Sequence, residues 1–169
     1  MGEPHNRGIE STAAVARHPL HPMLVPLPIA AFIFALIADI AWLKTDRPFW
    51  GEASHWLLLT GVIAGLVAAI PGIVDYLASE RVRNLPAARL HGALNTFVRL
   101  LGAVNLMLRS GQGATPIFGI GIILSFATVA ILGVSGWLGG ELSYRHGVGV
   151  MARGADSLPN DEPAVRQGL

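Results

Sequence analysis

The sequence predicts an all-α integral membrane protein, an antiparallel bundle of four helices with both termini in the cytoplasm. Of its 169 residues, 52% are hydrophobic and only 14% are charged, whereas soluble domains carry about 25% charged residues. A soluble chain of this size and composition would expose large apolar patches, which soluble monomers avoid. The composition therefore indicates that lipid surrounds much of the surface.

Four apolar segments account for this composition, and each is long enough to cross a bilayer as a helix. They lie at about residues 23–43, 55–77, 90–108 and 116–140, and a spanning helix needs roughly 20 residues. Backbone polar groups must be paired inside lipid, and the alternation of a membrane β-strand is missing, so helix is the expected form. The connections are short, which makes consecutive helices antiparallel neighbours.

The two ends of the chain have a different composition from these segments. Residues 1–17 are polar and mixed in charge, and residues 147–169 are rich in Gly, Pro, Asp and Ser. We therefore expect a mobile N-terminal segment over 1–17, a transmembrane domain over 18–146 and a flexible tail over 147–169. The first apolar segment has no small-residue cleavage site before its polar flank, so we expect it to be retained as a helix.

Positive residues are distributed unequally between the two sides of the predicted bundle. Eight arginines fall on the side of the termini and of the loop between the second and third helices. The opposite side holds Lys44, Arg47 and Arg109. Because positively charged loops favour the cytoplasm, this bias predicts that both termini are cytoplasmic.

The third segment carries a single polar stripe. The residues that share this arc of the helix are His91, Asn95, Arg99, Gly102 and Asn105. Ionisable groups in a bilayer usually face the bundle interior, so Arg99 needs an acceptor there. Asp39 in the first helix is the best candidate by depth. We expect an Asp39–Arg99 pair that either fixes helix register or serves as an anion clamp or proton path.

A second group of polar side chains is expected at the cytoplasmic ends of the helices. Antiparallel helices would bring together His18, His21, Asp75, His91, Glu141, Arg145 and His146. Imidazole and carboxylate groups bind transition metals. One interpretation is therefore a divalent metal site made by His21, Asp75, His91, Glu141 and His146.

Two other interpretations of this group stay open. Histidines among His18, His21, His91 and His146 could hold the iron of haem b, with Arg145 pairing with a propionate. Alternatively, the side chains cap helices and contact headgroups, and Glu141 pairs with Arg145 four residues on. The sequence contains no HExxH or CxxCH motif, and it has no cysteines.

Small residues form strips on two of the predicted helices. They are Gly61 and Gly65 in the second helix, and Gly133, Gly136 and Gly140 in the fourth. Helices in lipid associate where small residues let two backbones approach closely. We expect these strips either to pack helices within one bundle or to dock a different subunit.

Several of these motifs resemble a bacterial family, domain of unknown function 2231. The matching stretches are His18-Pro-Leu-His-Pro-Met-Leu-Val-Pro-Leu-Pro-Ile29 leading to Asp39, Pro71-Gly72 leading to Asp75, His91 at the start of the third helix, and residues 136–150. The resemblance covers roughly residues 17–150 and implies a four-helix membrane domain. Some similar proteins join this domain to an iron–sulfur domain, which implies a link to electron transfer. This chain has no cysteines to hold such a cluster.

Together these features favour a small multi-pass accessory subunit of the bacterial inner membrane, without catalytic activity of its own. It would hold haem b or a divalent metal at the cytoplasmic-side cluster and take part in electron transfer. The alternatives are a structural subunit that docks a larger energy-transducing complex, and an ion or proton pathway. The expected partners are the lipid bilayer and another membrane protein or a second copy. A net charge of +1 gives no indication of nucleic-acid binding.

Overall fold

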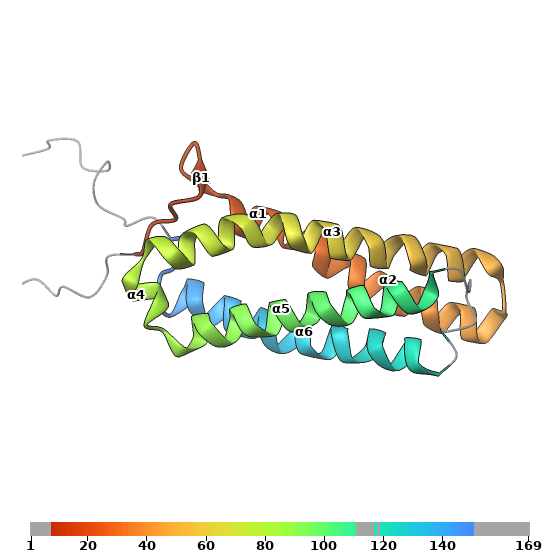
Figure 1. The fold of residues 1–169 in the computed structure, drawn as a ribbon. Helices are drawn as coiled ribbons and strands as arrows, with labels where there is room; N and C mark the ends of the chain where they lie inside the picture. Colours follow the sequence, from red (N-terminus) through yellow and green to blue (C-terminus); the bar gives the residue numbers. More distant parts are fainter. Residues whose placement is uncertain (1–7, 111–116, 118, 151–169) are drawn as a thin grey trace, which may run out of the picture.

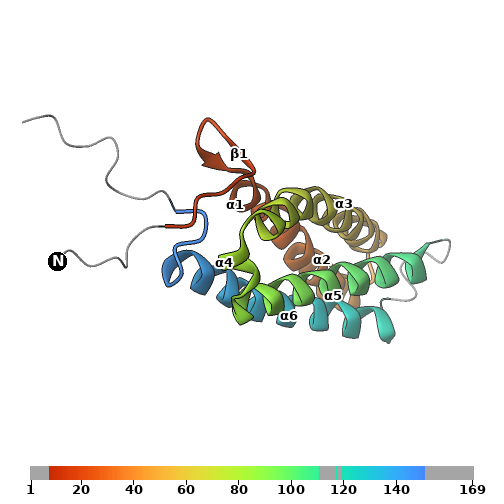
Figure 2. The same cartoon turned by 60° about the vertical axis from the view of Figure 1, so that its left-hand side comes forward.

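The computed structural model describes residues 8–110, 117 and 119–150 (Figure 1). The elements in order are β1 (Ala14–Val15), β2 (His18–Pro19), α1 (Leu20–Leu24), α2 (Pro26–Thr45), α3 (Pro48–Ala78), α4 (Glu80–Arg83), α5 (Pro86–Arg109) and α6 (Ile120–Tyr144). The described chain is mostly helical, as the sequence predicts. The helices α2, α3, α5 and α6 lie side by side along one long axis (Figure 1, Figure 2).

Proline and a left-handed residue set the ends of the long helices. Pro26, Pro48 and Pro86 each occupy the first turn of a helix, where a missing N–H costs no helical hydrogen bond. The helix α2 ends at Thr45, and the capping residue Asp46 has a φ of +50° and donates its N–H to Trp42 O. Only two residues therefore separate α2 from α3. The second helix begins seven residues earlier than predicted, at Pro48 rather than residue 55.

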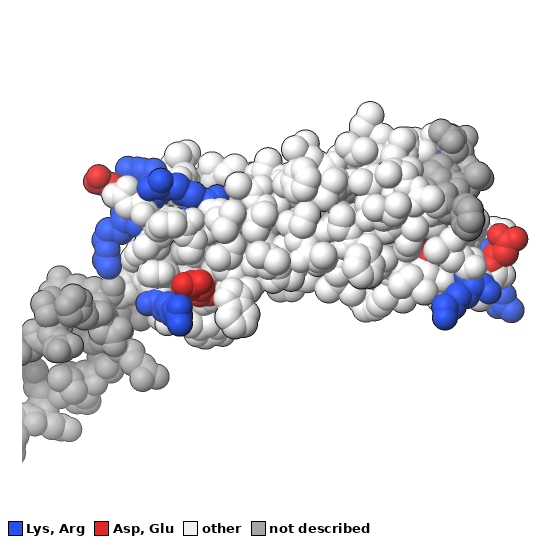
Figure 3. All heavy atoms as spheres, turned by 90° about the horizontal axis from the view of Figure 1, so that it is seen from below, with Lys and Arg blue, Asp and Glu red and all other residues white. Residues whose placement is uncertain are grey.

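Three helical stretches are long and apolar enough to cross a membrane. They are Leu20–Thr45, Pro48–Ala78 and Ile120–Tyr144. Among the described residues, α5 is the remaining long helix, and it falls outside this set because it carries the polar stripe. On the face shown in Figure 3, the charged side chains lie at the two ends of the molecule and none lies between them. This distribution is the one expected of a chain whose middle is surrounded by lipid.

Close packing around Phe32 joins three of the long helices. Phe32 forms the core with Ala35, Leu58 and Val98. Its ring lies where two glycines leave room: a Cβ added at Gly61 or Gly102 would lie 2.9 or 2.6 Å from Phe32 Cε1. The absence of side chains at these positions therefore lets α3 and α5 approach the aromatic ring on α2.

The N-terminal segment folds back onto the bundle. The strands β1 and β2 pair antiparallel, and the turn between them places Ala16 and Arg17 at φ values of +49° and +66°. Ser11 Oγ and the Ala13 N–H both donate to the Asp75 carboxylate on α3, each at 2.8 Å. The segment is thus anchored by the last turns of α3.

The start and the end of the described chain also meet. Ile9 and Val148 form a parallel bridge, with the Ile9 N–H bonded to Gly147 O and the Gly149 N–H bonded to Ile9 O, both at 2.8 Å. Hydrogen bonds to Asp75 and Ile9 therefore connect residues 8–17 and 147–150 to the rest of the described chain. The mobility of 1–17 and the flexibility of 147–169 stay predictions. Residues 1–7 and 151–169 lie outside the described residues.

Candidate functional site

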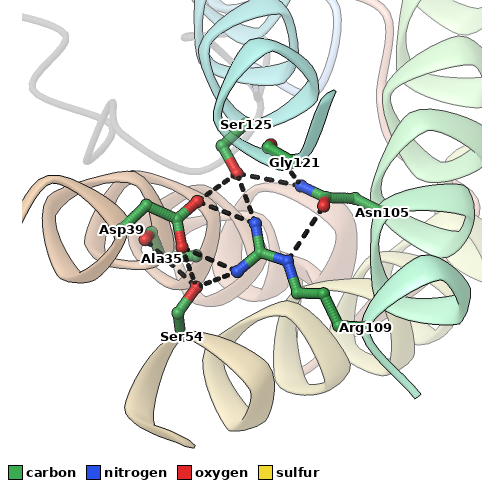
Figure 4. A network of polar contacts seen from close by, with 7 residues as sticks. All are labelled: Ala35, Asp39, Ser54, Asn105, Arg109, Gly121 and Ser125. Carbon is green, nitrogen blue, oxygen red and sulfur yellow. Dashed lines mark hydrogen bonds and ion pairs between the residues drawn. The ribbon is translucent and has the colours of Figure 1, made fainter. Parts of the chain in front are cut away.

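A buried polar network joins the four long helices near the connection between α2 and α3 (Figure 4). Its members are the side chains of Asp39, Ser54, Asn105, Arg109 and Ser125, and the main-chain carbonyls of Ala35 and Gly121. Each of these side chains belongs to a residue that is at most 2% exposed. The network therefore lies inside the bundle and faces neither lipid nor water.

Arg109 is the centre of this network. Its guanidinium forms a fork with Asp39, with Nη1 to Oδ1 at 2.6 Å and Nη2 to Oδ2 at 2.8 Å. Nη1 also donates to Ser54 Oγ at 2.6 Å, and Nη2 to Ser125 Oγ at 3.2 Å. Nε donates to Asn105 Oδ1 at 3.0 Å. All five N–H donors of the guanidinium thus have acceptors.

The remaining groups of the network are also paired. Ser54 Oγ donates to Asp39 Oδ1 at 2.5 Å, and Ser125 Oγ donates to Asp39 Oδ2 at 2.6 Å. Asn105 Nδ2 donates to Ser125 Oγ and to Gly121 O, at 2.9 and 3.1 Å. Among the described residues, no buried side-chain nitrogen or oxygen lacks a partner. A network this complete stabilises one arrangement of four helices and leaves no group free for chemistry.

The predicted Asp39–Arg99 pair is wrong, because Asp39 pairs with Arg109 instead. Sequence reasoning placed Arg109 in a loop, whereas it is the last residue of α5 and its side chain turns inward. Asp39 lies in the C-terminal half of α2, beside the end of α5 that carries Arg109. Arg99 lies closer to the middle of α5 and donates to Thr96 Oγ at 3.0 Å. A continuous Asp39–Arg99–His91 pathway is therefore not formed.

Two histidines meet toward the opposite end of the bundle. His21 Nδ1 lies 2.8 Å from Ala68 O on α3, and His91 Nδ1 lies 2.9 Å from Ser135 O on α6. Their ring centroids are 6.2 Å apart and the ring planes are perpendicular. A carbonyl can only accept, so each ring donates Nδ1–H. In a neutral imidazole this assignment makes Nε2 the acceptor.

Asn95 lies beside the His91 ring and leaves its Nε2 lone pair available. The Asn95 Nδ2 atom is 2.6 Å from Ser135 Oγ, 2.9 Å from His91 O and 3.2 Å from His91 Nε2. An amide nitrogen has only two hydrogens, and the two shorter contacts use them. The third and longest contact, between Asn95 Nδ2 and His91 Nε2, can therefore be replaced by a contact from His91 Nε2 to another group.

Proline and glycine residues make room for the two imidazole rings. Pro71 has no N–H, so α3 lacks one regular hydrogen bond immediately before Gly72. A Cβ added at Gly72 would lie 2.9 Å from His21 Nδ1, and one at Gly139 would lie 3.2 Å from His91 Cε1. These two glycines thus let the rings lie directly against α3 and α6.

The other members of the predicted metal and haem sites do not join the histidine pair. His18 and His146 are exposed. Asp75 is engaged by the N-terminal segment, and Glu141 pairs with Arg145 on the surface at 3.3 Å. Within the described ranges, no three His, Cys, Asp or Glu side chains are grouped so that they could hold a metal ion. The predicted five-residue site is therefore not assembled, because its carboxylates have other partners.

The predicted glycine strips fall in two different environments. Gly61 packs on Phe32, and a Cβ at Gly65 would lie 3.4 Å from Arg99 Cγ and Cδ. In contrast, a Cβ at Gly133 or Gly136 would meet nothing within 4 Å, and both residues are exposed on α6. One at Gly140 would meet only Tyr144 Cδ2, at 4.0 Å. The α3 strip is therefore filled inside the bundle, whereas Gly133 and Gly136 face outward.

Sequence reasoning did not identify Ser54 and Ser125, and it interpreted Ser135 only as part of a small-residue packing strip. Ser54, Ser125 and Ser135 are each at most 2% exposed and hydrogen-bond to charged or polar partners. Single serines are common in membrane helices, so their presence alone carries little information. A usable signal was the spacing between Ser125 and Ser135 on α6, which equals that between Asn95 and Asn105 on the antiparallel α5.

The fold and the two polar clusters define a helical membrane protein with an apolar surface and with polar clusters inside its bundle. The chain belongs to the family of predicted membrane proteins designated DUF2231, which it matches over residues 17–152. The resemblance carried by the histidine and proline motifs is thereby confirmed. No curated protein and no solved structure gives a significant match to the chain.

Proposed function

We propose that the chain crosses the bacterial cytoplasmic membrane four times, with α5 as the fourth span. The outward face of α5 is apolar, with exposures of 46–72% at Leu90, Phe97, Leu100, Val104 and Met107. The polar residues that lower its hydropathy, such as Asn105 and Arg109, are buried. Lipid would therefore meet an apolar surface even along this helix.

The distribution of charge supports a cytoplasmic location for both termini. Arg109 is engaged in the buried network, so it cannot contact headgroups on the outer side. Lys44 and Arg47 are then the positive residues that remain there, against eight arginines on the other side. The burial of Arg109 thus strengthens the bias that predicts orientation.

Within this membrane placement, we propose that the protein is an accessory redox subunit that binds a metal centre between His21 and His91. The observation that carries this proposal is the fixation of both Nδ1 atoms on main-chain carbonyls, at 2.8 and 2.9 Å. Metal-binding histidines almost always donate their second ring N–H to a carbonyl or carboxylate. Both Nε2 atoms are then acceptors suited to a metal.

The distance between the two ring centroids is compatible with one metal atom that is bound by both Nε2 atoms. With metal–nitrogen bonds of about 2.0–2.1 Å, two imidazoles on opposite sides of one metal have centroids roughly 6.4 Å apart. The observed separation is 6.2 Å. Haem b iron and a single metal ion both satisfy this distance. The rings themselves fill the space over Gly72 and Gly139, and Asn95 and Ser135 offer oxygen ligands for a single ion.

Spectroscopy and elemental analysis of protein purified from its native membrane test this proposal. We expect either a Soret band or about one metal atom per chain, and loss of it in His21→Ala and His91→Ala. His55→Ala is the matched control, because His55 contacts Trp56 near the start of α3, far from the pair. A wild-type sample with neither a Soret band nor stoichiometric metal would overturn the proposal.

A second candidate function is that of a structural subunit docked to a larger membrane complex through α6. The outward position of Gly133 and Gly136 favours it, since nothing lies within 4 Å of a Cβ at either residue. Gly136→Leu should then abolish co-purification of the partner in mild detergent. Val134→Leu, also on the exposed side of α6, should preserve it. Equal co-purification of both variants would exclude this surface.

A further inference from the structure

Arg99 carries a charge that its surroundings leave largely unpaired. Its guanidinium donates from Nη2 to Thr96 Oγ at 3.0 Å. Among the described residues, no Asp or Glu carboxylate oxygen lies within 4.0 Å of an Arg99 guanidinium nitrogen. Arg109 on the same helix has acceptors for all five N–H donors. Since a guanidinium stays protonated in proteins, Arg99 needs a further acceptor.

The position of Arg99 along α5 limits where that acceptor can come from. Arg99 is ten residues from Arg109 and thirteen from Pro86, the two ends of the helix. At 1.5 Å per residue, these ends lie about 15 and about 20 Å away. Headgroup phosphates at either membrane face are therefore beyond the reach of one side chain.

The surface next to Arg99 is apolar and open. Its Cγ and Cδ atoms pack over Gly65 of α3, where a Cβ would lie 3.4 Å away. Thr96, which accepts the hydrogen bond from Arg99, is exposed, and Leu100 is 58% exposed. On α3, Leu66 is 56% exposed. A single polar spot in this apolar surface suits an apolar helix that carries one anionic side chain.

We propose that this face, between α3 and α5, receives a partner transmembrane helix whose membrane-buried Asp or Glu pairs with Arg99. The inference rests on the proposed role as an accessory membrane subunit and names the chemistry of its partner. A second copy of this chain does not fit. Asp39 is fully buried and saturated by Arg109, and Asp75 is engaged by Ser11 and Ala13.

The test uses the full-length protein in nanodiscs of zwitterionic lipid and synthetic Leu/Ala helices of about 20 residues. One helix has a central Glu and the other has Gln at the same place. Association is measured by fluorescence energy transfer. We expect the Glu helix to bind about tenfold more tightly than the Gln helix, as one charged interhelical contact allows. Arg99→Gln should remove this preference and Arg99→Lys should keep part of it.

Two controls separate this proposal from its alternatives. Arg145→Gln, at an exposed charge beyond the end of α6, should keep the full preference. Equal binding of the two helices to the wild type, or an unchanged preference in Arg99→Gln, would overturn the proposal. So would loss of the preference when phosphatidylglycerol is added, because Arg99 would then be a lipid site. Metal content is measured in the same samples. Protein that contains metal but does not prefer the Glu helix contradicts the partner-helix proposal and leaves the redox role intact. Protein that prefers the Glu helix but contains no metal contradicts the redox role and leaves the partner-helix proposal intact.

Discussion

Arg109 and Asp39 form a forked ion pair in the bundle interior, where the Arg109 side chain is 1% exposed and that of Asp39 is 0% exposed. The pair connects α5 to α2, and its serine partners extend the connection to α3 and α6. A buried pair adds little net stability relative to apolar side chains of the same volume, but loss of one partner leaves an uncompensated charge. Its main consequence is therefore to specify which helices meet.

Arg109→Leu should destabilise the protein by about 3–5 kcal/mol, because the Asp39 carboxylate would remain buried without its counter-ion. Unfolding by sodium dodecyl sulfate in mixed micelles measures this change. The double variant Asp39→Leu/Arg109→Leu should regain much of the loss, since no charge is then left unpaired. Arg145→Leu, which breaks the surface pair with Glu141, should change stability by less than about 1 kcal/mol. A double variant as unstable as the sum of the single variants would contradict this role of the pair.

Ser125→Ala should cost about 1–3 kcal/mol, because it removes a donor to Asp39 and an acceptor for Asn105 at a fully buried position. The same unfolding assay measures it. Ser110→Ala removes an exposed hydroxyl that donates to Leu106 O within its own helix turn, so its effect should be close to zero. Equal effects at the two serines would show that the network does not contribute to stability.

Gly102→Ala should destabilise the bundle by about 1–3 kcal/mol, because its Cβ would lie 2.6 Å from Phe32 Cε1. Gly133→Ala is the matched control on α6, where a Cβ would meet nothing within 4 Å. There alanine should be neutral or stabilising, since it has the higher helix propensity. Adding Phe32→Leu to Gly102→Ala should relieve the contact. A Gly102→Ala variant as stable as Gly133→Ala would contradict the packing around Phe32.

Asp75→Ala should release the N-terminal segment from α3, because Ser11 and Ala13 lose their acceptor. Limited trypsin digestion after Arg17 measures this release, and cleavage should accelerate several-fold as local opening becomes easier. Glu52→Ala, at an exposed site near the start of α3, should be cleaved at the wild-type rate. Unchanged cleavage in Asp75→Ala would show that other contacts hold the segment.

Sequence reasoning predicted the helical architecture well, because lipid imposes strong limits on composition and segment length. It also predicted that the polar residues of α5 share one arc, since helical periodicity fixes which residues share a face. Asn95 and Asn105 on this arc hydrogen-bond to serines of α6. The partner of Asp39 was not predictable in this way. Predicted depth in the membrane allows either Arg99 or Arg109 to pair with Asp39. Which of the two does so depends on where α5 ends and on how far α5 is shifted along α2.

In the candidate site, too, the sequence indicates which residues are unusual but does not indicate which of them come into contact. Sequence reasoning placed His21 and His91 at the same end of the bundle, and their ring centroids lie 6.2 Å apart. That proximity depends on the Pro71-Gly72 region of α3 and on Gly139. The two carboxylates of the predicted cluster bind other groups near the helix ends: Asp75 accepts a hydrogen bond from Ser11, and Glu141 pairs with Arg145. Such competition for hydrogen-bond partners is set by packing, which helical periodicity alone does not contain.

The membrane placement on which every proposal depends is tested most directly by cysteine accessibility, because the natural chain has no cysteines. Single variants are made at Arg47, between α2 and α3, at Asn84, between α4 and α5, and at Phe126, which is 65% exposed on α6. In intact spheroplasts a membrane-impermeant maleimide should label Arg47→Cys only. Asn84→Cys should react after permeabilisation, and Phe126→Cys only after the membrane is dissolved in detergent. Labelling of Arg47→Cys and Asn84→Cys from the same side, or of Phe126→Cys in the intact membrane, would contradict the four-pass arrangement.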